Sequence, residues 1–121
     1  MIKGLYPFGL NHYRSLKFQK LRKLISKNQK KIKVEGAYGS SLSFLLIDIF
    51  SSINQQIFYI SNSKETASYV YSDIVELIGE INCSFLPSNY RSDAKKIKDE
   101  SNIINRSKTI RDILDKETKI I

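Results

Sequence analysis

The residues of this chain that could do chemistry by type and spacing lie in one eight-residue segment, residues 36–43. The segment reads Gly-Ala-Tyr-Gly-Ser-Ser-Leu-Ser and follows the outline of a phosphate-binding loop, G-x-x-x-x-G-K-[ST]. In such a loop backbone N–H groups wrap the phosphates, the lysine reaches the β- and γ-phosphates, and the last hydroxyl holds Mg²⁺. Here Ser41 replaces the second glycine and Leu42 replaces the lysine. The pattern therefore predicts a vestigial loop that binds no cofactor, made of Gly36, Gly39, Ser40, Ser41, Leu42 and Ser43.

The same segment is also compatible with an ordinary turn between a strand and a helix. Glycine relieves a positive φ, and serine caps a helix, without any nucleotide. Shortly afterwards, Leu45-Leu46-Ile47-Asp48 imitates the four apolar residues and the aspartate that complete a Mg²⁺ site in nucleoside triphosphatases, but that motif belongs on a strand. We therefore predict that Asp48 is a surface residue of a helix and that the segment has no metal ligands.

Positive charge is concentrated in the first part of the chain. The formal net charge is +8; residues 1–34 hold ten Lys or Arg and no acid, whereas residues 35–121 hold ten bases and twelve acids. Such a block can attract nucleic acid, an anionic membrane or an acidic partner. No aromatic residues are interleaved on the basic face, so a solvated helix face is equally compatible. The candidate nucleic-acid contacts are Arg14, Lys17, Lys20, Lys23, Lys27, Lys30 and Lys31.

The chain has one cysteine, Cys83, and one histidine, His12. A lone cysteine excludes a C-x-x-C metal pair and a disulfide framework within the chain, so we expect an intracellular protein with Cys83 as a buried thiol. A histidine-based metal site or a Ser-His-Asp triad would depend on His12 alone. Because no cluster supplies a nucleophile or base, the sequence predicts no enzyme activity for this segment. The first residues do not form a secretory signal and no apolar stretch could span a bilayer, so we expect the cytoplasm and no membrane partner.

Hydrophobic periodicity defines the elements that must position the loop. Residues 13–27 predict a basic amphipathic helix, and residues 32–34 a short strand before the loop. The apolar positions from Leu42 to Ile53 then predict a helix that lies on a sheet. Further on, the pattern predicts buried strands at residues 57–60, 83–86 and 119–121.

Two further helices are expected between these strands. The first carries apolar positions from Ala67 to Ile78; Asn62 can cap it, with Glu65 at the capping-box position, and it ends near Gly79. The second spans residues 103–114. A polar stretch over residues 88–101 is expected to be a surface excursion.

Strands that alternate with helices imply right-handed parallel crossovers. We therefore expect an α/β fold, with a three-layer P-loop-NTPase-like (helicase-like) parallel sheet and flanking helices. Residues 1–33 would form a basic helical segment that packs on the domain, and residues 34–121 the degenerate P-loop-like domain. Because a domain seldom stops two residues into a buried strand, we expect a fragment of a longer chain.

Five short segments, in a fixed order, resemble a known family. They are Glu35-Gly36-Ala37-Tyr38-Gly39-Ser40-Ser41; Ile57 to Ser61 followed by Lys64-Glu65-Thr66-Ala67; Asp73-Ile74-Val75-Glu76-Leu77; Phe85-Leu86-Pro87; and Asn105-Arg106-Ser107 before Ile110-Arg111-Asp112-Ile113-Leu114. This order is similar to the N-terminal, excinuclease-subunit-B-like domain of the bacterial transcription-repair coupling factor. The resemblance covers roughly residues 10–121. It departs from the family where Ser88-Asn89-Tyr90-Arg91 leads into a lysine-rich stretch instead of an aromatic-rich one.

In that family the N-terminal module is a degenerate copy of a helicase domain, and the ATPase motor lies far downstream. The resemblance therefore implies a nucleotide-incompetent scaffold or regulatory domain within an ATP-dependent DNA translocase that removes stalled RNA polymerase and recruits nucleotide excision repair. The partners that it implies are the rest of the same polypeptide, RNA polymerase, duplex DNA and the excinuclease A subunit, whose binding surface lies in a following domain. The alternative function is a basic nucleic-acid-binding module.

Overall fold

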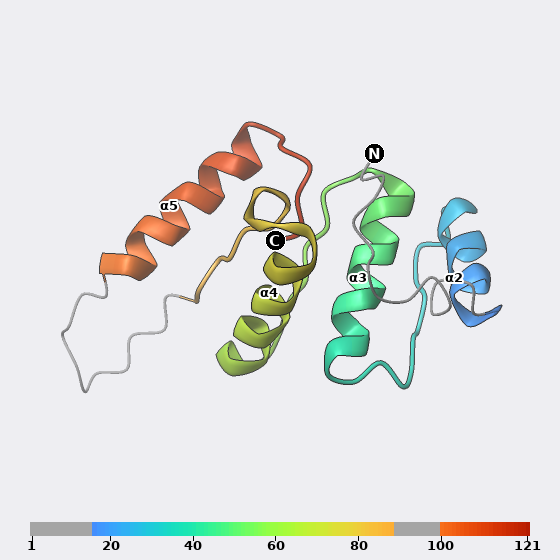
Figure 1. Ribbon diagram of the computed structural model, residues 1–121. Coiled ribbons are helices and arrows are strands. Elements are labelled where there is room, and N and C mark those ends of the chain that lie inside the picture. Colours follow the sequence, from blue (N-terminus) through green and yellow to red (C-terminus); the bar gives the residue numbers. More distant parts are fainter. Residues whose placement is uncertain (1–15, 89–99) are drawn as a thin grey trace.

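The computed structural model of the chain describes residues 16–88 and 100–121, and the regular structure within these ranges is helical (Figure 1). It comprises α2 (Leu16–Ser26), α3 (Ser40–Ile53), α4 (Lys64–Ile78), the short 3-10 helix η1 (Glu80–Asn82) and α5 (Glu100–Leu114). In Figure 1 the four α-helices follow one another from right to left in chain order. None of the helices in the described ranges is long and apolar enough to cross a membrane.

The prediction of an α/β fold with a three-layer P-loop-NTPase-like parallel sheet is wrong. In residues 16–88 and 100–121 the extended segments are joined only by two isolated parallel bridges, from Ile120 to Ile57 and from Ile120 to Cys83. The N–H of Ile57 donates to the carbonyl of Lys119 at 3.0 Å, and that of Ser84 donates to the carbonyl of Ile120 at 2.9 Å. Strands in sheets usually run for about five or six residues. The three apolar runs have strand-like composition, but they pair over too short a length to build a sheet.

The strand expected at residues 32–34 is also not formed. No backbone hydrogen bond joins residues 31–37 to any other described residue, and Val34 keeps 47% of its surface exposed. β-branched residues favour the extended conformation, but a strand exists only where its backbone has a partner. This stretch is therefore a connection between α2 and α3.

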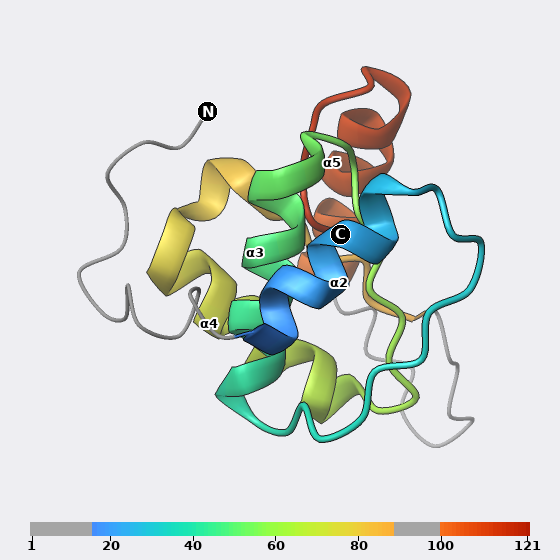
Figure 2. The same cartoon turned by 90° about the vertical axis from the view of Figure 1, so that its right-hand side faces the viewer.

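Helix α3 is the centre of the packing because other helices cover it on two sides, as Figure 2 shows. On the α4 side, Ile47 and Phe50 join the core that Ile74 and Ile120 complete. On the other side α3 lies against α2. The apolar positions that predict this helix at helical spacing do not include Ile47, which is fully buried, because a single stripe describes a helix that is covered on one side only. These positions are Leu42, Leu45, Leu46, Ile49, Phe50 and Ile53.

The N-cap of α4 lies one residue later than predicted. Ser63, not Asn62, is the N-cap: its hydroxyl accepts the N–H of Thr66 at 3.3 Å. The same hydroxyl donates to Glu65 at 2.7 Å, which lowers the pKa of that carboxyl below its ordinary value. The predicted end at Gly79 is confirmed, with a positive φ of 85° that glycine adopts without strain.

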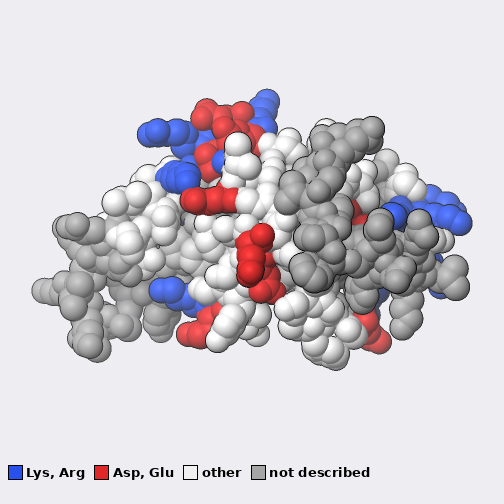
Figure 3. Space-filling view, viewed as in Figure 1, with Lys and Arg blue, Asp and Glu red and all other residues white. Residues whose placement is uncertain are grey.

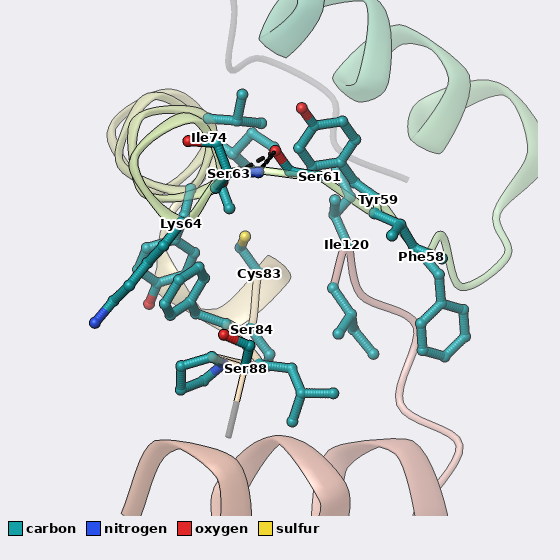
Figure 4. A pocket seen from close by; sticks show the side chains of 18 of the residues that line it. Phe58, Tyr59, Ser61, Ser63, Lys64, Ile74, Cys83, Ser84, Ser88 and Ile120 are labelled. Carbon is teal, nitrogen blue, oxygen red and sulfur yellow. Dashed lines mark hydrogen bonds between the residues drawn. The ribbon is translucent and has the colours of Figure 1, made fainter. Parts of the chain in front are cut away.

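Helix α5 is attached to the extended segments by buried polar contacts. Thr109 donates from its hydroxyl to the carbonyl of Phe85 at 2.9 Å, and Ser84 donates to the carboxylate of Asp112 at 2.6 Å. Lys119 forms an ion pair with the same carboxylate at 3.0 Å. The three extended segments therefore lie between α5 on one side and α3 with α4 on the other, as Figures 1 and 4 show.

Candidate functional site

The loop before α3 keeps the backbone shape that its glycines allow. Gly36 has a φ of 83° and Gly39 a φ of 54°, values that residues with a side chain rarely adopt. Gly39 is the N-cap of α3, and no side chain caps the helix there. A turn of this kind at a helix N-terminus is where a phosphate would bind, if the free N–H groups pointed toward it.

Two of the N–H groups at this helix start are instead used within the loop itself. The N–H of Ser41 donates to the carbonyl of Tyr38 at 3.2 Å, and the N–H of Leu42 donates to the carbonyl of Gly39 at 3.1 Å. The hydroxyl of Ser41 donates to the Tyr38 carbonyl at 2.6 Å and accepts the Tyr38 N–H at 2.8 Å. A phosphate could reach these amides only by breaking bonds that close the turn.

The residue at the Mg²⁺-binding position of the motif, Ser43, is buried and has a structural partner. Its side chain is fully buried, and its hydroxyl donates to the carboxylate of Asp73 at 3.0 Å. This bond joins α3 to α4. The hydroxyl therefore points into the helix interface and not toward the loop, where a metal would be held.

Leu42, at the position that a lysine occupies in a working phosphate loop, is an apolar residue that takes part in packing. Leu42 is half-buried and packs against the core formed by α3, α4 and Ile120. A side chain in this position can neither reach a phosphate nor neutralise its charge. Of the predicted loop residues, Ser40 is exposed, and its hydroxyl makes no hydrogen bond within the described residues.

Asp48 is not the surface residue that the sequence predicts. It is 3% exposed and forms an ion pair with Arg22 of α2, with Nε of Arg22 donating to Oδ2 at 3.0 Å. The prediction failed because it considered α3 alone, whereas α2 covers the face on which Asp48 lies. Arg22, a residue outside every sequence-based candidate set, is therefore a main contact between α2 and α3.

The cysteine is a buried thiol, as expected. Cys83 is 4% exposed, and burial raises the pKa of its thiol to about 12. A thiol with so high a pKa is not a nucleophile near neutral pH. The only histidine, His12, lies outside the described residues, and in the described part of the chain no three His, Cys, Asp or Glu side chains gather as a metal site.

A cavity of about 430 Å³ lies where the extended segments end and α4 begins (Figure 4). Phe58, Tyr59 and Cys83 line it together with Ser61, whose hydroxyl accepts the N–H of Ser63 at 3.3 Å. In Figure 4 the ammonium of Lys64 points away from the cavity. Sequence reasoning missed this cavity. Among the described residues that line it, the ionisable ones are Tyr59, Lys64, Tyr71, Cys83 and Arg106, and none of these described residues is a carboxylate or a histidine.

The basic candidates fall into described and undescribed groups. Arg14 lies outside the described residues, as do residues 89–91 of the lysine-rich departure, and the side chain of Lys17 is not described. The remaining five are exposed and make no ion pair within the described ranges: Lys20, Lys23, Lys27, Lys30 and Lys31. Figure 3 shows blue side chains gathered on the right, where α2 lies in Figure 1.

In the described residues the regular structure is helical, and hydrogen bonds within the loop before α3 close the turn at Ser41 and Leu42. Comparison with models of known protein families, with curated proteins and with solved structures gives no match to this chain.

Proposed function

We propose that this chain is a nucleotide-incompetent scaffold and regulatory module of a transcription-repair coupling factor. The observation that carries the proposal is the closed loop: the amides of Ser41 and Leu42 and the hydroxyl of Ser43 are all bonded within the protein. In this proposal, the residues that follow the outline of a phosphate loop serve to close the turn and to pack α3 against α4. The order of sequence segments that resembles the coupling factor supports the assignment to that protein.

The energies of the site argue against nucleotide binding. A helix N-terminus attracts one negative charge by about 0.3–1 kcal/mol when no lysine assists it. Opening the loop would break the hydrogen bonds of Ser41 and Leu42, each worth about 0.5–1.5 kcal/mol. The attraction of the helix N-terminus for one negative charge is therefore smaller than the free energy needed to break the hydrogen bonds of the Ser41 and Leu42 amides.

Calorimetric titration with Mg-ATP tests the nucleotide part of this proposal. We expect no binding heat from the wild-type chain at millimolar nucleotide. The variant Ser41→Gly/Leu42→Lys should bind only weakly, because Ser43 stays bonded to Asp73 and no group of carboxylates in the described part of the chain is placed to hold Mg²⁺. Micromolar binding by the double variant would contradict this account of the site, and saturable binding by the wild type would overturn the proposed function.

The biological context follows from the resemblance and is part of the same proposal. The module would act in the bacterial cytoplasm as part of an ATP-dependent DNA translocase that removes stalled RNA polymerase and recruits the excinuclease A subunit to duplex DNA. It would itself contact the rest of the same polypeptide. Deleting the segment from the full-length gene should disturb the preferential repair of the transcribed strand while leaving the downstream ATPase active. Unchanged strand preference would contradict the assignment.

One observation favours a second function, a basic nucleic-acid-binding module. The five exposed lysines of α2 and of the connection after it make no ion pair in the described part of the chain. Phosphate contacts by these lysines would be independent of sequence and steeply salt-dependent. An isolated chain that fails to bind duplex DNA even at low salt would exclude this function for the segment.

A further inference from the structure

A groove of about 660 Å³ separates α2 from the connection that leads to α3. Its floor is apolar: Leu21 and Leu45 are buried there, Ile32 is half-buried, and Val34 is 47% exposed. Of the sequence-based functional candidates that the structure describes, Lys20, Gly36 and Ser41 line it. The groove is separate from the cavity at the start of α4.

One wall of the groove has a backbone without hydrogen-bond partners among the described residues. No backbone hydrogen bond joins residues 31–37 to any other residue in the part of the chain that the structure describes. Unpaired N–H and C=O groups on an extended segment are a template for another chain to add to. The side chains of this wall alternate in type, with apolar Ile32 and Val34 between the charged Lys31, Lys33 and Glu35.

The surroundings of the groove are strongly positive. Residues 16–39 carry eight Lys or Arg and a single acid, Glu35. That acid is paired with Lys33 at 2.6 Å, but both side chains are highly exposed, so the pair contributes little. Lys20 and Lys33 line the groove itself together with Glu35, so its lining carries two bases and one acid. A partner that fits this surface therefore brings negative charge as well as apolar side chains.

We propose that residues 31–35 bind an extended peptide by strand addition, and that the side chains of this peptide alternate between apolar and acidic. The backbone of the peptide would bond to the unpaired N–H and C=O groups, its apolar side chains would enter the groove, and its acids would face the lysines. Binding of this kind takes its affinity from main-chain bonds and its specificity from alternate side chains. The inference rests on the proposed scaffold function, since it names the kind of partner that the scaffold would hold.

The apolar floor favours a peptide over nucleic acid. Contacts to phosphate require basic side chains but no apolar groove next to them. Gly36 turns the chain with its φ of 83°, so the part of the wall that a strand can pair with is residues 31–35, which span about 17 Å at 3.3 Å per residue. A peptide of about nine residues is therefore long enough to cover this part of the wall.

The test is fluorescence anisotropy with the intact chain and a labelled, end-blocked peptide of about nine residues that alternates valine and glutamate. A matched peptide with lysine in place of glutamate should bind at least about tenfold more weakly, because it repels the lysines. A third peptide, N-methylated on alternate residues along its bonding edge, should also bind at least about tenfold more weakly, because it keeps the side chains but loses the donors. Equal binding of the N-methylated and parent peptides overturns strand addition.

Two proline variants test the same point from the protein side. Successive N–H groups of an extended chain point to opposite edges, so Lys33→Pro and Val34→Pro remove donors on different edges. We expect one variant to weaken binding at least about tenfold more than the other, with Lys33→Gln and Val34→Ala as side-chain controls. Equal effects of the two prolines overturn the proposal. Neither proline removes a backbone hydrogen bond within the described structure. Lys33→Gln controls for the exposed ion pair with Glu35 that Lys33→Pro removes, and the N-methylated peptide gives an independent answer if a variant fails to fold.

The outcomes separate this inference from the proposed function. No binding of the valine-glutamate peptide, together with a silent Mg-ATP titration, overturns strand addition and leaves the scaffold function standing. Saturable Mg-ATP binding overturns the scaffold function whatever the peptide does. Displacement of the peptide by a short DNA duplex, combined with undiminished binding of the N-methylated peptide, would identify the surface as a nucleic-acid face and overturn the peptide proposal.

Discussion

At the scale of single residues, Ser43 shows how a position in a phosphate-loop pattern can act in packing. The sequence identifies the hydroxyl, but it cannot show that Asp73, 30 positions away, accepts its hydrogen bond. Asp48 is a similar case, because its burial depends on Arg22 of a different helix. Local patterns report the residue type that a position needs, whereas the partner of a polar group is set by contacts between distant segments.

We predict that Ser43→Ala destabilises the chain by about 1–2 kcal/mol, because Asp73 loses a donor in the α3–α4 interface. Urea unfolding measures the change. Ser52→Ala is the matched control: this exposed hydroxyl on the same helix bonds only to the carbonyl of Asp48, and its loss should cost less than about 0.5 kcal/mol. Equal losses in the two variants would show that the Ser43 bond has no special role.

The buried carboxylate of Asp112 predicts a loss of stability in acid. The hydrogen bond from Ser84 lowers the pKa of Asp112; burial opposes this effect and the contact with Lys119 adds to it. Because the folded chain favours the charged form, the contribution is complete above the ordinary pKa of 3.8 and is lost as the pH falls through the lower folded value. Between about pH 5 and about pH 2, Asp112→Asn should therefore lose less stability than the wild type.

Denaturant unfolding at a series of pH values checks this prediction. Asp115→Asn on the exposed turn after α5 is the control and should follow the wild-type pH profile. A wild-type and an Asp112→Asn profile with the same acid slope would contradict the role given to the Ser84–Asp112–Lys119 cluster.

At the scale of elements, the helices could be predicted from the sequence and the sheet could not. Apolar spacing located α3 and α4, and Gly79 marked the end of α4, because these signals lie within a few residues of one another. The strands at residues 32–34, 57–60 and 83–86 were predicted from composition. Their pairing depends on segments far apart in the chain, and that information is not contained in a local run of β-branched residues.

The attachment of α2 to α3 gives a prediction at this scale. Arg22→Ala leaves Asp48 buried without its counter-charge and should cost about 1–3 kcal/mol, less than for a fully buried pair because the Arg22 side chain is 37% exposed. Thermal or urea unfolding measures the loss. Lys23→Ala removes an exposed charge from the same helix and should change stability by less than about 0.5 kcal/mol. Similar losses in both variants would mean that the ion pair does not hold the helices together.

At the scale of the whole molecule, Ile120 joins segments from the middle and the end of the chain. It bridges to both Ile57 and Cys83 and is 1% exposed in the core shared with α3 and α4. The sequence predicted that residues 119–121 are extended and apolar, but not that they lie between the other two extended segments. That order follows from the hydrogen bonds of Ile57 and Ser84, which reach the last three residues from opposite sides.

Ile120→Ala should therefore lower the stability of the whole chain by about 2–5 kcal/mol through the cavity that it leaves. Ile110→Ala, at a side chain that is 43% exposed, is the control and should cost no more than about 1 kcal/mol. Denaturant unfolding followed by circular dichroism should show one transition, and its midpoint should lie at a lower denaturant concentration in Ile120→Ala than in the wild type. Separate loss of α5, with α3 and α4 unaffected, would contradict a shared core.

The central claim is that the loop before α3 is closed to phosphate by its own hydrogen bonds. Amide NMR of the wild-type chain during titration with Mg-ATP tests it most directly, because the N–H signals of Ser41 and Leu42 report on the two bonds concerned. The account predicts that neither signal shows a saturable shift up to millimolar nucleotide. Saturable, stoichiometric shifts of both signals would show that the loop opens to bind phosphate, and would contradict the account.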